Sequence, residues 1–462
     1  MKVEQIYTGC LAQGAYYIES KGEAAIIDPL RDIKPYLERL EKNNVHLKYI
    51  FETHFHADFV SGHVDLHRKT GAPIVFGPGA QPDYEALIGE DGQIFPIGDI
   101  KIKMLHTPGH TMESVCYLLY DEDGKPYCLF SGDTLFLGDV GRPDLAQKVG
   151  ELTVEQLAGY LYDSLMNKIM PLPDDLIIYP AHGAGSACGK NMMKETSDTL
   201  EHQKLTNYAL RQPDKETFVR EVLDGLAPPP GYFGHNVQMN KVGYEQVSNV
   251  INKGMTGLSP AEFEEIAEET QAVILDVRSS GDFARGFIPR SINIGLEGQF
   301  APWVGAMLID TRTPILIVTY PGKEEETSIR LSRVGFDHQL GCIQGGIDAW
   351  INEGKEVDTV NRITAEEFLS EYSHQQETVI DVRADNEYQG GHFPDAVNLA
   401  LDSINDWSQN VRHTNNFYMH CAGGYRSMIA ASILKMRGIH DFKEIAGGYK
   451  AIKEKLEEKQ KV

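Results

Sequence analysis

The sequence predicts a multidomain α/β protein, and three observations lead to this prediction. The chain has 462 residues, which exceeds one ordinary core and suits two or three domains. In its first half, short apolar runs such as 24–28, 49–53 and 176–180 alternate with polar helical stretches, as in layered α/β domains. Its second half contains an internal repeat.

The charge excludes some partners. The formal net charge is −24, so nucleic acid or an anionic membrane surface would meet net repulsion. No stretch approaches the ~18 apolar residues that span a bilayer. We therefore expect a soluble protein without nucleic-acid or membrane partners.

The cysteines indicate the compartment. The chain has six of them and no Cys-x-x-Cys pair, which argues against a disulfide framework and against a thiolate zinc site. The start of the chain has no apolar signal region. Both observations favour a cytoplasmic protein.

Prolines indicate the domain boundary. Gly225 to Gly231 reads Gly-Leu-Ala-Pro-Pro-Pro-Gly, which cannot form a helix or a central strand. We assign residues 226–244 to a linker between an N-terminal domain, 1–225, and two further domains, 245–358 and 359–462.

The repeat has a period of 105 residues and includes Asp-Val-Arg twice, from Asp276 and from Asp381. Farther on, the Gly-Gly pairs at 345 and 447 are offset by 102 residues. Each copy begins with a capping box, a hydroxyl residue followed three positions later by glutamate. Buried strands are predicted at 272–276, 315–318, 378–381 and 417–419. Two homologous α/β domains with small parallel sheets are expected.

Histidines and aspartates follow several strands of the first domain. Thr53 begins the segment Thr-His-Phe-His-Ala-Asp, and His110, Asp133 and His182 each follow an apolar run. Neutral imidazoles and carboxylates suit a borderline divalent metal. The combined pattern predicts a metal site where strand ends converge.

On these motifs, residues 1–225 resemble the metallo-β-lactamase superfamily, whose fold is an αββα sandwich with metal at the strand ends. Dinuclear hydrolases of that superfamily usually carry His-x-His-x-Asp-His, but Phe59 replaces the last histidine here. The departure resembles the persulfide dioxygenase branch, in which two histidines and one aspartate hold a single Fe(II). The resemblance implies one Fe(II) per chain, with His54, His110 and Asp133 as ligands. Three such ligands on one side of the ion leave coordination positions open for dioxygen and a sulfur substrate.

Three neighbouring residues keep superfamily positions without being assigned to the metal. For His56, Asp58 and His182 we favour hydrogen bonding to the ligands, and direct ligation by His56 remains an alternative. Cys188 could lie near the site, although a lone cysteine is more often a packing residue.

Arg142 is a candidate for substrate binding. Its segment Gly-Arg-Pro-Asp resembles the one that helps persulfide dioxygenases hold the substrate's carboxylate. The alternative is a structural ion pair with Asp144 or Asp139.

A second candidate site is the loop Cys421-Ala-Gly-Gly-Tyr-Arg426, which follows a strand and precedes a helix. Gly423 and Gly424 allow backbone N–H groups to point inward. The helix start and Arg426 add positive potential, which favours a thiolate. We expect Cys421 to be the nucleophile.

The two C-terminal domains resemble the rhodanese family, and residues 421–426 match its active-site loop. The resemblance implies that Cys421 carries sulfur as a persulfide. In the first copy, Cys421 maps to 316–319, which has no cysteine, and an acidic run follows at 324–326. Cys342 is interpreted as a packing residue. The first copy is expected to be an inactive spacer or a dimerisation domain, so the chain could form a homo-oligomer.

Together, the motifs resemble persulfide dioxygenase–rhodanese fusions. The implied reactions are oxidation of small thiol persulfides with dioxygen to sulfite and thiol, and transfer of sulfur through Cys421 to sulfite, giving thiosulfate. One alternative is a thioester hydrolase of the glyoxalase II type with two metals. Another is a persulfide-sensing scaffold in which Cys421 is only modified.

Overall fold

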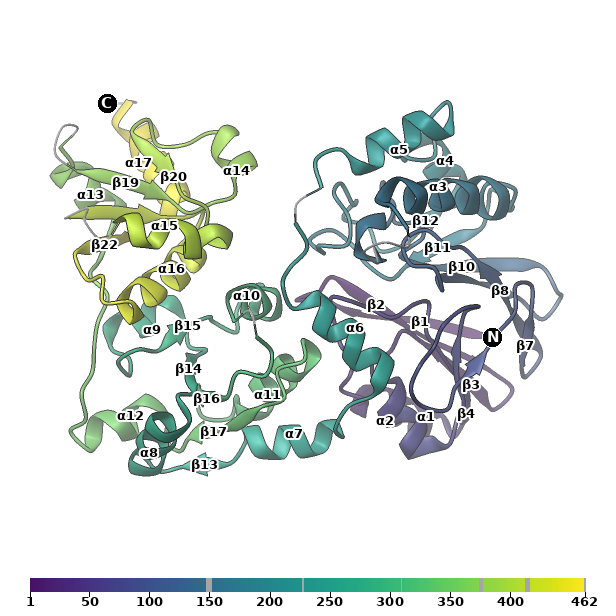
Figure 1. The fold of residues 1–462 in the computed structure, drawn as a ribbon, viewed down its shortest axis with the longest axis horizontal. Coiled ribbons are helices and arrows are strands. Elements are labelled where there is room, and N and C mark those ends of the chain that lie inside the picture. The colour runs from purple at the N-terminus through teal and green to yellow at the C-terminus, as the bar shows by residue number, and fades with distance from the viewer. Residues whose placement is uncertain (147–151, 227, 309, 374–376, 412–415, 461–462) are drawn as a thin grey trace. The chain divides into compact units, whose positions relative to one another are not determined.

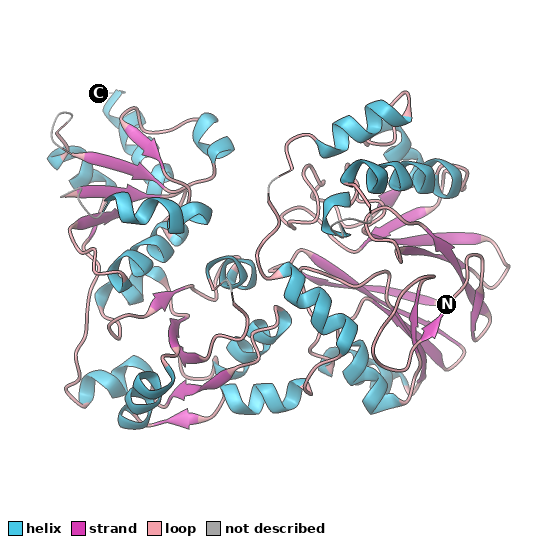
Figure 2. Cartoon of the chain, viewed as in Figure 1, coloured by secondary structure: helices cyan, strands magenta, loops and turns pink. Residues whose placement is uncertain are grey.

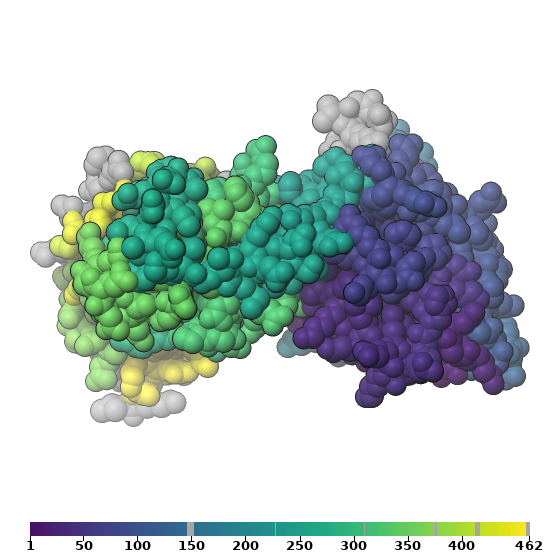
Figure 3. All heavy atoms as spheres, turned by 90° about the horizontal axis from the view of Figure 1, so that it is seen from below, coloured from purple at the N-terminus to yellow at the C-terminus, as the bar shows by residue number. Residues whose placement is uncertain are grey.

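A computed structural model describes residues 1–146, 152–226, 228–308, 310–373, 377–411 and 416–460. The chain divides into two compact units. The first comprises residues 1–247 with 332–335, and the second comprises 248–331 with 336–462. Figure 1 labels their elements, Figure 2 distinguishes helices from strands by colour, and Figure 3 shows one face of the chain with all heavy atoms as spheres.

The first unit contains two six-stranded sheets. In the first sheet, β1 to β3 are antiparallel and β3 to β6 are parallel. Its strands, in spatial order, are β1 (Lys2–Thr8), β2 (Gln13–Ser20), β3 (Glu23–Ile27), β4 (His46–Phe51), β5 (Ile74–Phe76) and β6 (Leu87–Ile88). The second sheet has the order β12 (Asp198–Thr199), β11 (Ile177–Pro180), β10 (Pro126–Gly132), β9 (Val115–Tyr120), β8 (Ile100–His106) and β7 (Ile94–Ile97).

Three apolar layers hold this unit together. Between the sheets, side chains such as Ile27 and Phe51 meet Phe130 and Tyr117 of the opposite sheet. Helices α1 (Lys34–Asn43) and α2 (His63–Thr70) cover the outer face of the first sheet. The outer face of the second sheet packs against α3 (Val154–Ser164), its extension η2 (Leu165–Ile169), α4 (Leu200–Thr206) and α5 (Lys215–Leu223). A short helix η1 (Pro143–Ala146) follows β10. The predicted αββα sandwich is confirmed.

The segment assigned to the linker differs from its prediction. Pro228–Pro230 is irregular, but α6 (Phe233–Val242) fills most of the remainder and belongs to the first unit. Met239 and Tyr244 join the core formed with α1 and α2. The prolines stop a helix only where they stand, and the apolar residues after them supply a packing face.

The second unit contains two five-stranded parallel sheets with the same strand order. The first copy has the order β13 (Gly257–Leu258), β17 (Gln339–Ile343), β16 (Ile315–Val318), β14 (Val273–Asp276), β15 (Ile292–Asn293). The second has β18 (Arg362–Ile363), β22 (Phe442–Ile445), β21 (Phe417–His420), β19 (Thr378–Asp381), β20 (Ala396–Asn398). The equal order confirms that the sequence repeat is a domain repeat.

Helices cover these sheets. Those of the first copy are α8 (Pro260–Thr270), α9 (Ser280–Arg285), α10 (Phe300–Met307), α11 (Glu324–Arg333) and α12 (Gly346–Asn352), preceded by α7 (Val247–Gly254). Those of the second are α13 (Ala365–Glu371), α14 (Asp385–Gln389), η3 (Leu401–Ser403), α15 (Ile404–Val411), α16 (Tyr425–Met436) and α17 (Gly448–Gln460). Ser259 and Thr364 cap α8 and α13 through both hydrogen bonds of the predicted capping boxes.

Two predictions concerning the environment can be compared with these elements. None of the helices in the described ranges combines the length and the apolar character needed to cross a membrane. All six cysteines are free, as the absence of a disulfide pattern predicts.

Candidate metal centre and sulfur-transfer loop

His54, His110 and Asp133 converge from three separate segments of the first unit. His54 follows β4, Asp133 follows β10, and His110 lies between β8 and β9. Asp133 Oδ2 is 3.8 Å from His54 Nε2 and 3.5 Å from His110 Nε2. All three residues are buried, and their ligand atoms lie within 4.8 Å of one another. The predicted metal ligands therefore form one cluster.

The second nitrogen of each imidazole has a hydrogen-bond partner that fixes the ring. His54 Nδ1 is 3.0 Å from Thr53 Oγ1, and His110 Nδ1 is 2.8 Å from the carbonyl oxygen of Arg142. Each Nε2 is thereby left for the centre of the cluster. Such outer hydrogen bonds are usual around metal-binding histidines.

The protonation states suit a cation. Burial lowers the pKa of His110 to about 4 and that of His54 well below its ordinary value, so both rings are neutral. Burial raises the pKa of Asp133 to about 6. Within the described residues neither carboxylate oxygen of Asp133 has a hydrogen-bond partner. A buried carboxylate in that state fits a bound metal ion, which would favour its charged form.

His56, Asp58 and His182 form a second group whose ligand atoms also lie within 4.8 Å of one another. His182 Nδ1 is 3.5 Å from Asp58 Oδ2. His56 Nε2 lies 3.1 Å from Asp28 Oδ1; burial lowers the pKa of His56, but Asp28 outweighs it and raises that pKa to about 9. His56 therefore has a carboxylate partner in Asp28 in addition to its place in this group.

Phe59 completes this region in place of a histidine. It is fully buried and stacks on the His56 ring, with centroids 4.3 Å apart. Cys188 is buried too, and its sulfur lies close to side-chain atoms of Asp133 and His182. Burial raises the pKa of the Cys188 thiol well above its ordinary value.

Asn240 on α6 is a residue that the sequence analysis missed. Its side-chain amide donates to the carbonyl oxygens of His56 (2.9 Å) and Phe59 (2.8 Å), and its oxygen accepts the N–H of Ser61 (2.8 Å). It thereby holds the loop that carries the histidine and aspartate motif. In the sequence it stands in a stretch of mixed apolar and polar residues after the prolines, which carries no signal of this role.

The Arg142 guanidinium forms hydrogen bonds within the protein. Its Nε and Nη2 donate to the two carboxylate oxygens of Asp144, at 2.8 and 2.7 Å, and Nη1 donates to the carbonyl oxygen of Ala187. This is the geometry expected of a structural ion pair between Arg142 and Asp144, the alternative to substrate binding. Binding of a substrate carboxylate by Arg142 stays a prediction.

A cavity of about 310 Å³ opens beside His110. Its walls are mainly apolar, and the charged side chains among them are Glu113 and Lys241. The apolar part of the lining includes Phe55, Met112, Leu145, Leu152 and Val237. A small organic molecule placed there would reach the His110 side of the cluster.

The transfer loop lies in the second unit, between β21 and α16. Cys421 is 1% exposed, and the N–H of Gly424 donates to its sulfur at 3.1 Å. Gly424 has a φ of 96°, a conformation that favours glycine. A Cβ at Gly423 would meet nothing within 4 Å, so that residue is not required by space. One amide and a helix start therefore face the sulfur.

The second Gly-Gly pair fits closely against this loop. The N–H of Tyr449 donates to the Cys421 carbonyl oxygen at 2.7 Å. A Cβ on Gly448 would lie 2.2 Å from that oxygen, so only glycine allows the approach. Arg426 does not face open space, because its Nη2 donates to Glu387 at 2.7 Å. Its predicted binding of an anion stays a prediction.

Strand register identifies the counterpart of Cys421 in the first copy. His420 pairs with Asp381, and Val318 pairs with Asp276, the equivalent aspartate. The next residue, Thr319, therefore occupies the position of Cys421. The acidic run begins α11 at Glu324.

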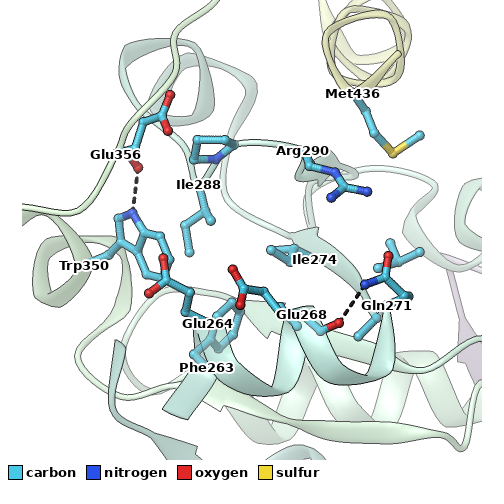
Figure 4. A pocket seen from close by; sticks show the side chains of 14 residues that line it. Phe263, Glu264, Glu268, Gln271, Ile274, Ile288, Arg290, Trp350, Glu356 and Met436 are labelled. Carbon is cyan, nitrogen blue, oxygen red and sulfur yellow. Dashed lines mark hydrogen bonds between the residues drawn. The ribbon is translucent and has the colours of Figure 1, made fainter. Parts of the chain in front are cut away.

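The second unit also has a cavity of about 290 Å³ (Figure 4), and its lining residues include neither Thr319 nor Cys421. Its lining includes the aromatic residues Phe263 and Trp350, the acidic residues Glu264, Glu268 and Glu356, and Arg290. The Trp350 indole N–H donates to the Glu356 carbonyl oxygen at 2.7 Å.

Comparison with known proteins agrees with this division. Residues 8–182 match the family model of the metallo-beta-lactamase superfamily, and residues 259–353 and 364–455 match that of the rhodanese-like domain. A hydroxyacylglutathione hydrolase of Pelagibacter ubique is 36% identical over 179 residues, which cover 37% of this chain and 68% of that protein.

Two solved structures are similar to parts of this chain. A metallo-beta-lactamase from Staphylococcus aureus is 31% identical, with a TM-score of 0.67, covering 74% of this chain and 98% of that one. ETHE1 from Myxococcus xanthus is 25% identical with a TM-score of 0.45, covering 52% of this chain and 98% of that one.

With its two facing sheets, outer helices and buried histidine–aspartate cluster, the first unit is a metal-binding domain, and the chain belongs to the metallo-β-lactamase superfamily. More particularly, it is a fusion in which that domain is followed by two rhodanese-like domains.

Proposed function

We propose that the chain oxidises low-molecular-weight persulfides with dioxygen, and that Cys421 then transfers sulfane sulfur to the sulfite formed. The observation that carries the proposal is the pairing, in one chain, of a two-histidine, one-carboxylate cluster with a cysteine beneath a backbone N–H at a helix start. One persulfide, one dioxygen and one water give one thiol, one sulfite and two protons. Sulfite and a second sulfane sulfur give thiosulfate.

His54, His110 and Asp133 would hold one Fe(II). When bound, the ion supplies the dioxygen chemistry that amino-acid side chains lack. Thr53 and the carbonyl oxygen of Arg142 keep the two imidazoles oriented. The cavity beside His110 would accommodate the thiol part of the substrate and exclude water from it.

In the transfer loop, Cys421 would attack the outer sulfur of a persulfide and carry that sulfur itself. The N–H of Gly424 and the start of α16 would stabilise the negative charge on the sulfur. Sulfite would then remove the carried sulfur.

The test is metal content together with oxygen consumption on glutathione persulfide. We expect one iron per chain, and loss of iron and of oxygen uptake in His110→Ala. His202→Ala, a control at an exposed side chain of α4, should retain both. Two stoichiometric zinc ions in an active preparation, or full oxygen uptake by His110→Ala, would contradict the proposal.

A second candidate is hydrolysis of a glutathione thioester, favoured by the similarity to the Pelagibacter hydrolase and by the second group of His56, Asp58 and His182. It requires two metals and no oxygen. Release of thiol from S-lactoylglutathione under nitrogen would favour it.

A further inference from the structure

A chain of buried polar contacts leads away from Cys421 into the second rhodanese-like domain. Ser427 Oγ lies 3.5 Å from the Cys421 sulfur and donates to Glu444 Oε1 at 2.7 Å. The other oxygen of Glu444 accepts the Arg362 Nε–H at 2.7 Å. Ser427 and Glu444 are completely buried. A thiol, a hydroxyl, a carboxylate and a guanidinium thus form one connected path.

The first copy lacks this path at equivalent positions. Arg362 pairs with Glu444 between β18 and β22, whereas Gly257 pairs with Cys342 between β13 and β17. Thr319 stands where Cys421 stands. The second copy has both the cysteine and the arginine–glutamate pair, and the first copy has neither at the equivalent positions.

Packing alone does not account for the pair. Glu444 is buried while Arg362 is partly exposed. Removing a carboxylate from water costs free energy that attraction to an arginine often fails to exceed, and apolar replacements of such pairs are frequently as stable. The glycine and cysteine of the first copy show that the same fold accepts an uncharged pair there. Burial raises the pKa of Glu444, while Arg362 and Ser427 act in the opposite direction. A raised carboxyl pKa makes Glu444 a better proton acceptor from a thiol.

We propose that Ser427 and Glu444 form a proton relay for Cys421, and that Arg362 is the positioning residue that holds Glu444. This inference rests on the proposed transfer function and adds the base to it. The Cys421 proton passes to Ser427 Oγ while the Ser427 proton passes to Glu444 Oε1. The electron pair of the broken S–H bond stays on sulfur.

The thiolate then attacks the outer sulfur of a persulfide R–S–SH. The bond between Cys421 and that sulfur forms, the S–S bond of the donor breaks, and R–S⁻ leaves with the electron pair. When sulfite later takes the sulfur, thiosulfate is released, and Cys421 returns as a thiolate that Glu444 can reprotonate through Ser427.

Other charged groups near the loop are already paired with one another. Arg426 is paired with Glu387, Arg383 with Asp381, and the buried His420 lies 3.9 Å from Asp381. Burial lowers the pKa of His420, which keeps the ring neutral. Of the charged and titratable groups that face the loop, Glu444 is the one that the contacts with Ser427 single out. These groups are Arg362, Asp381, Arg383, Glu387, His420, Arg426 and Glu444.

The test follows Cys421 in the full-length chain by two measurements across a range of pH. One is alkylation by iodoacetamide, quantified on the Cys421 peptide by mass spectrometry; the other is sulfur transfer from thiosulfate to cyanide. Glu444→Gln and Ser427→Ala should each slow alkylation and sulfur transfer about tenfold or more at neutral pH. This decrease in rate should become smaller above pH about 8.5, where an ordinary thiol ionises without a base. The double variant should be no slower than the slower single one.

Ser432→Ala is the matched control, because its hydroxyl lies on the same helix but contacts the Ile429 carbonyl oxygen and the N–H of Asn293 instead of Cys421. It should alkylate like the unmodified chain. Unchanged alkylation in Glu444→Gln, multiplying losses in the double variant, or an equal loss at every pH would overturn the relay. If Glu444→Gln fails to fold, Ser427→Ala decides alone. Alkylation does not require sulfur transfer, so an unmodified chain that alkylates as expected but transfers no sulfur would refute the proposed function and leave the relay standing.

Discussion

The two rhodanese-like copies have one backbone and different polar interiors. In both, the arginine of Asp-Val-Arg binds its aspartate at 2.6 Å and donates to a glycine carbonyl oxygen at 2.8 Å. Strand order and the capping of the first helix of each copy, α8 and α13, are also the same. The register-equivalent positions at which the copies differ include those where Gly257, Thr319 and Cys342 replace Arg362, Cys421 and Glu444.

This difference separates what maintains the fold from what supports chemistry. The shared aspartate–arginine pair is retained with identical contacts, so it belongs to the architecture. The second set is present only where a nucleophile stands, so it belongs to the site. Fold alone therefore does not assign activity to either copy.

The largest expected effect comes from Cys421→Ser in the full-length chain. Serine preserves the loop, but its hydroxyl cannot take up sulfane sulfur as a persulfide. Sulfur transfer should fall to background, oxygen uptake should persist, and sulfite should accumulate in place of thiosulfate. Thiol labelling with chromatography measures the products, with the spontaneous reaction of sulfite and persulfide as blank.

Cys342→Ala serves as its control, because it removes the cysteine of the first copy and should leave transfer intact. Since the first copy is present in Cys421→Ser, thiosulfate formed above the blank would show either that this copy is active or that Cys421 is not the sulfur carrier.

A smaller effect, on stability, is expected from Arg362→Gly. Glu444 would keep its buried position without its cation, at a cost of about 2–3 kcal/mol in the free energy of unfolding, reduced from the usual range because Arg362 is partly exposed. Adding Glu444→Cys copies the uncharged pair of the first domain and should recover most of the loss in urea unfolding. Sulfur transfer should remain low in both variants. Recovery of transfer together with stability would show that the pair serves packing.

The sequence predicted the features that depend on local pattern. The repeat, the capping boxes and the strands 315–318 and 378–381 follow from spacing and residue type, and the structure has them. The convergence of His54, His110 and Asp133 was also predictable, because residues that follow parallel or adjacent strands meet at one edge of a layered fold.

Contacts between distant segments were not predictable in this way. Asn240 reaches the His56 loop from a segment that its prolines assigned to a linker. Glu444 and Arg362 are 82 residues apart and meet only through strand pairing. Nothing in their local sequence distinguishes them from surface charges, since burial is decided by the partner strand.

A modest effect is expected from Tyr425→Phe, which tests whether the first copy supports the second. The Tyr425 hydroxyl donates to the Gly295 carbonyl oxygen of the first copy at 2.7 Å. Its loss should lower the free energy of unfolding by about 1 kcal/mol, whereas Tyr160→Phe, on an exposed face of α3, should change nothing. Urea unfolding measures both. A change in the transfer rate much larger than the change in stability would mean that the first copy also controls the loop.

The smallest effect is expected from restoring the missing thiol. In a Cys421→Ser background, Thr319→Cys should leave sulfur transfer at background, although a cysteine would again follow the central strand. Two features of the first copy explain this. Gly257 and Cys342 supply no base. The acidic run that begins α11 at Glu324 repels anionic sulfur donors.

Transfer from thiosulfate to cyanide is the measurement. Activity from Thr319→Cys alone would show that the loop and the charged pair are dispensable, whereas activity only after adding Gly257→Arg and Cys342→Glu would assign the difference between the copies to that pair.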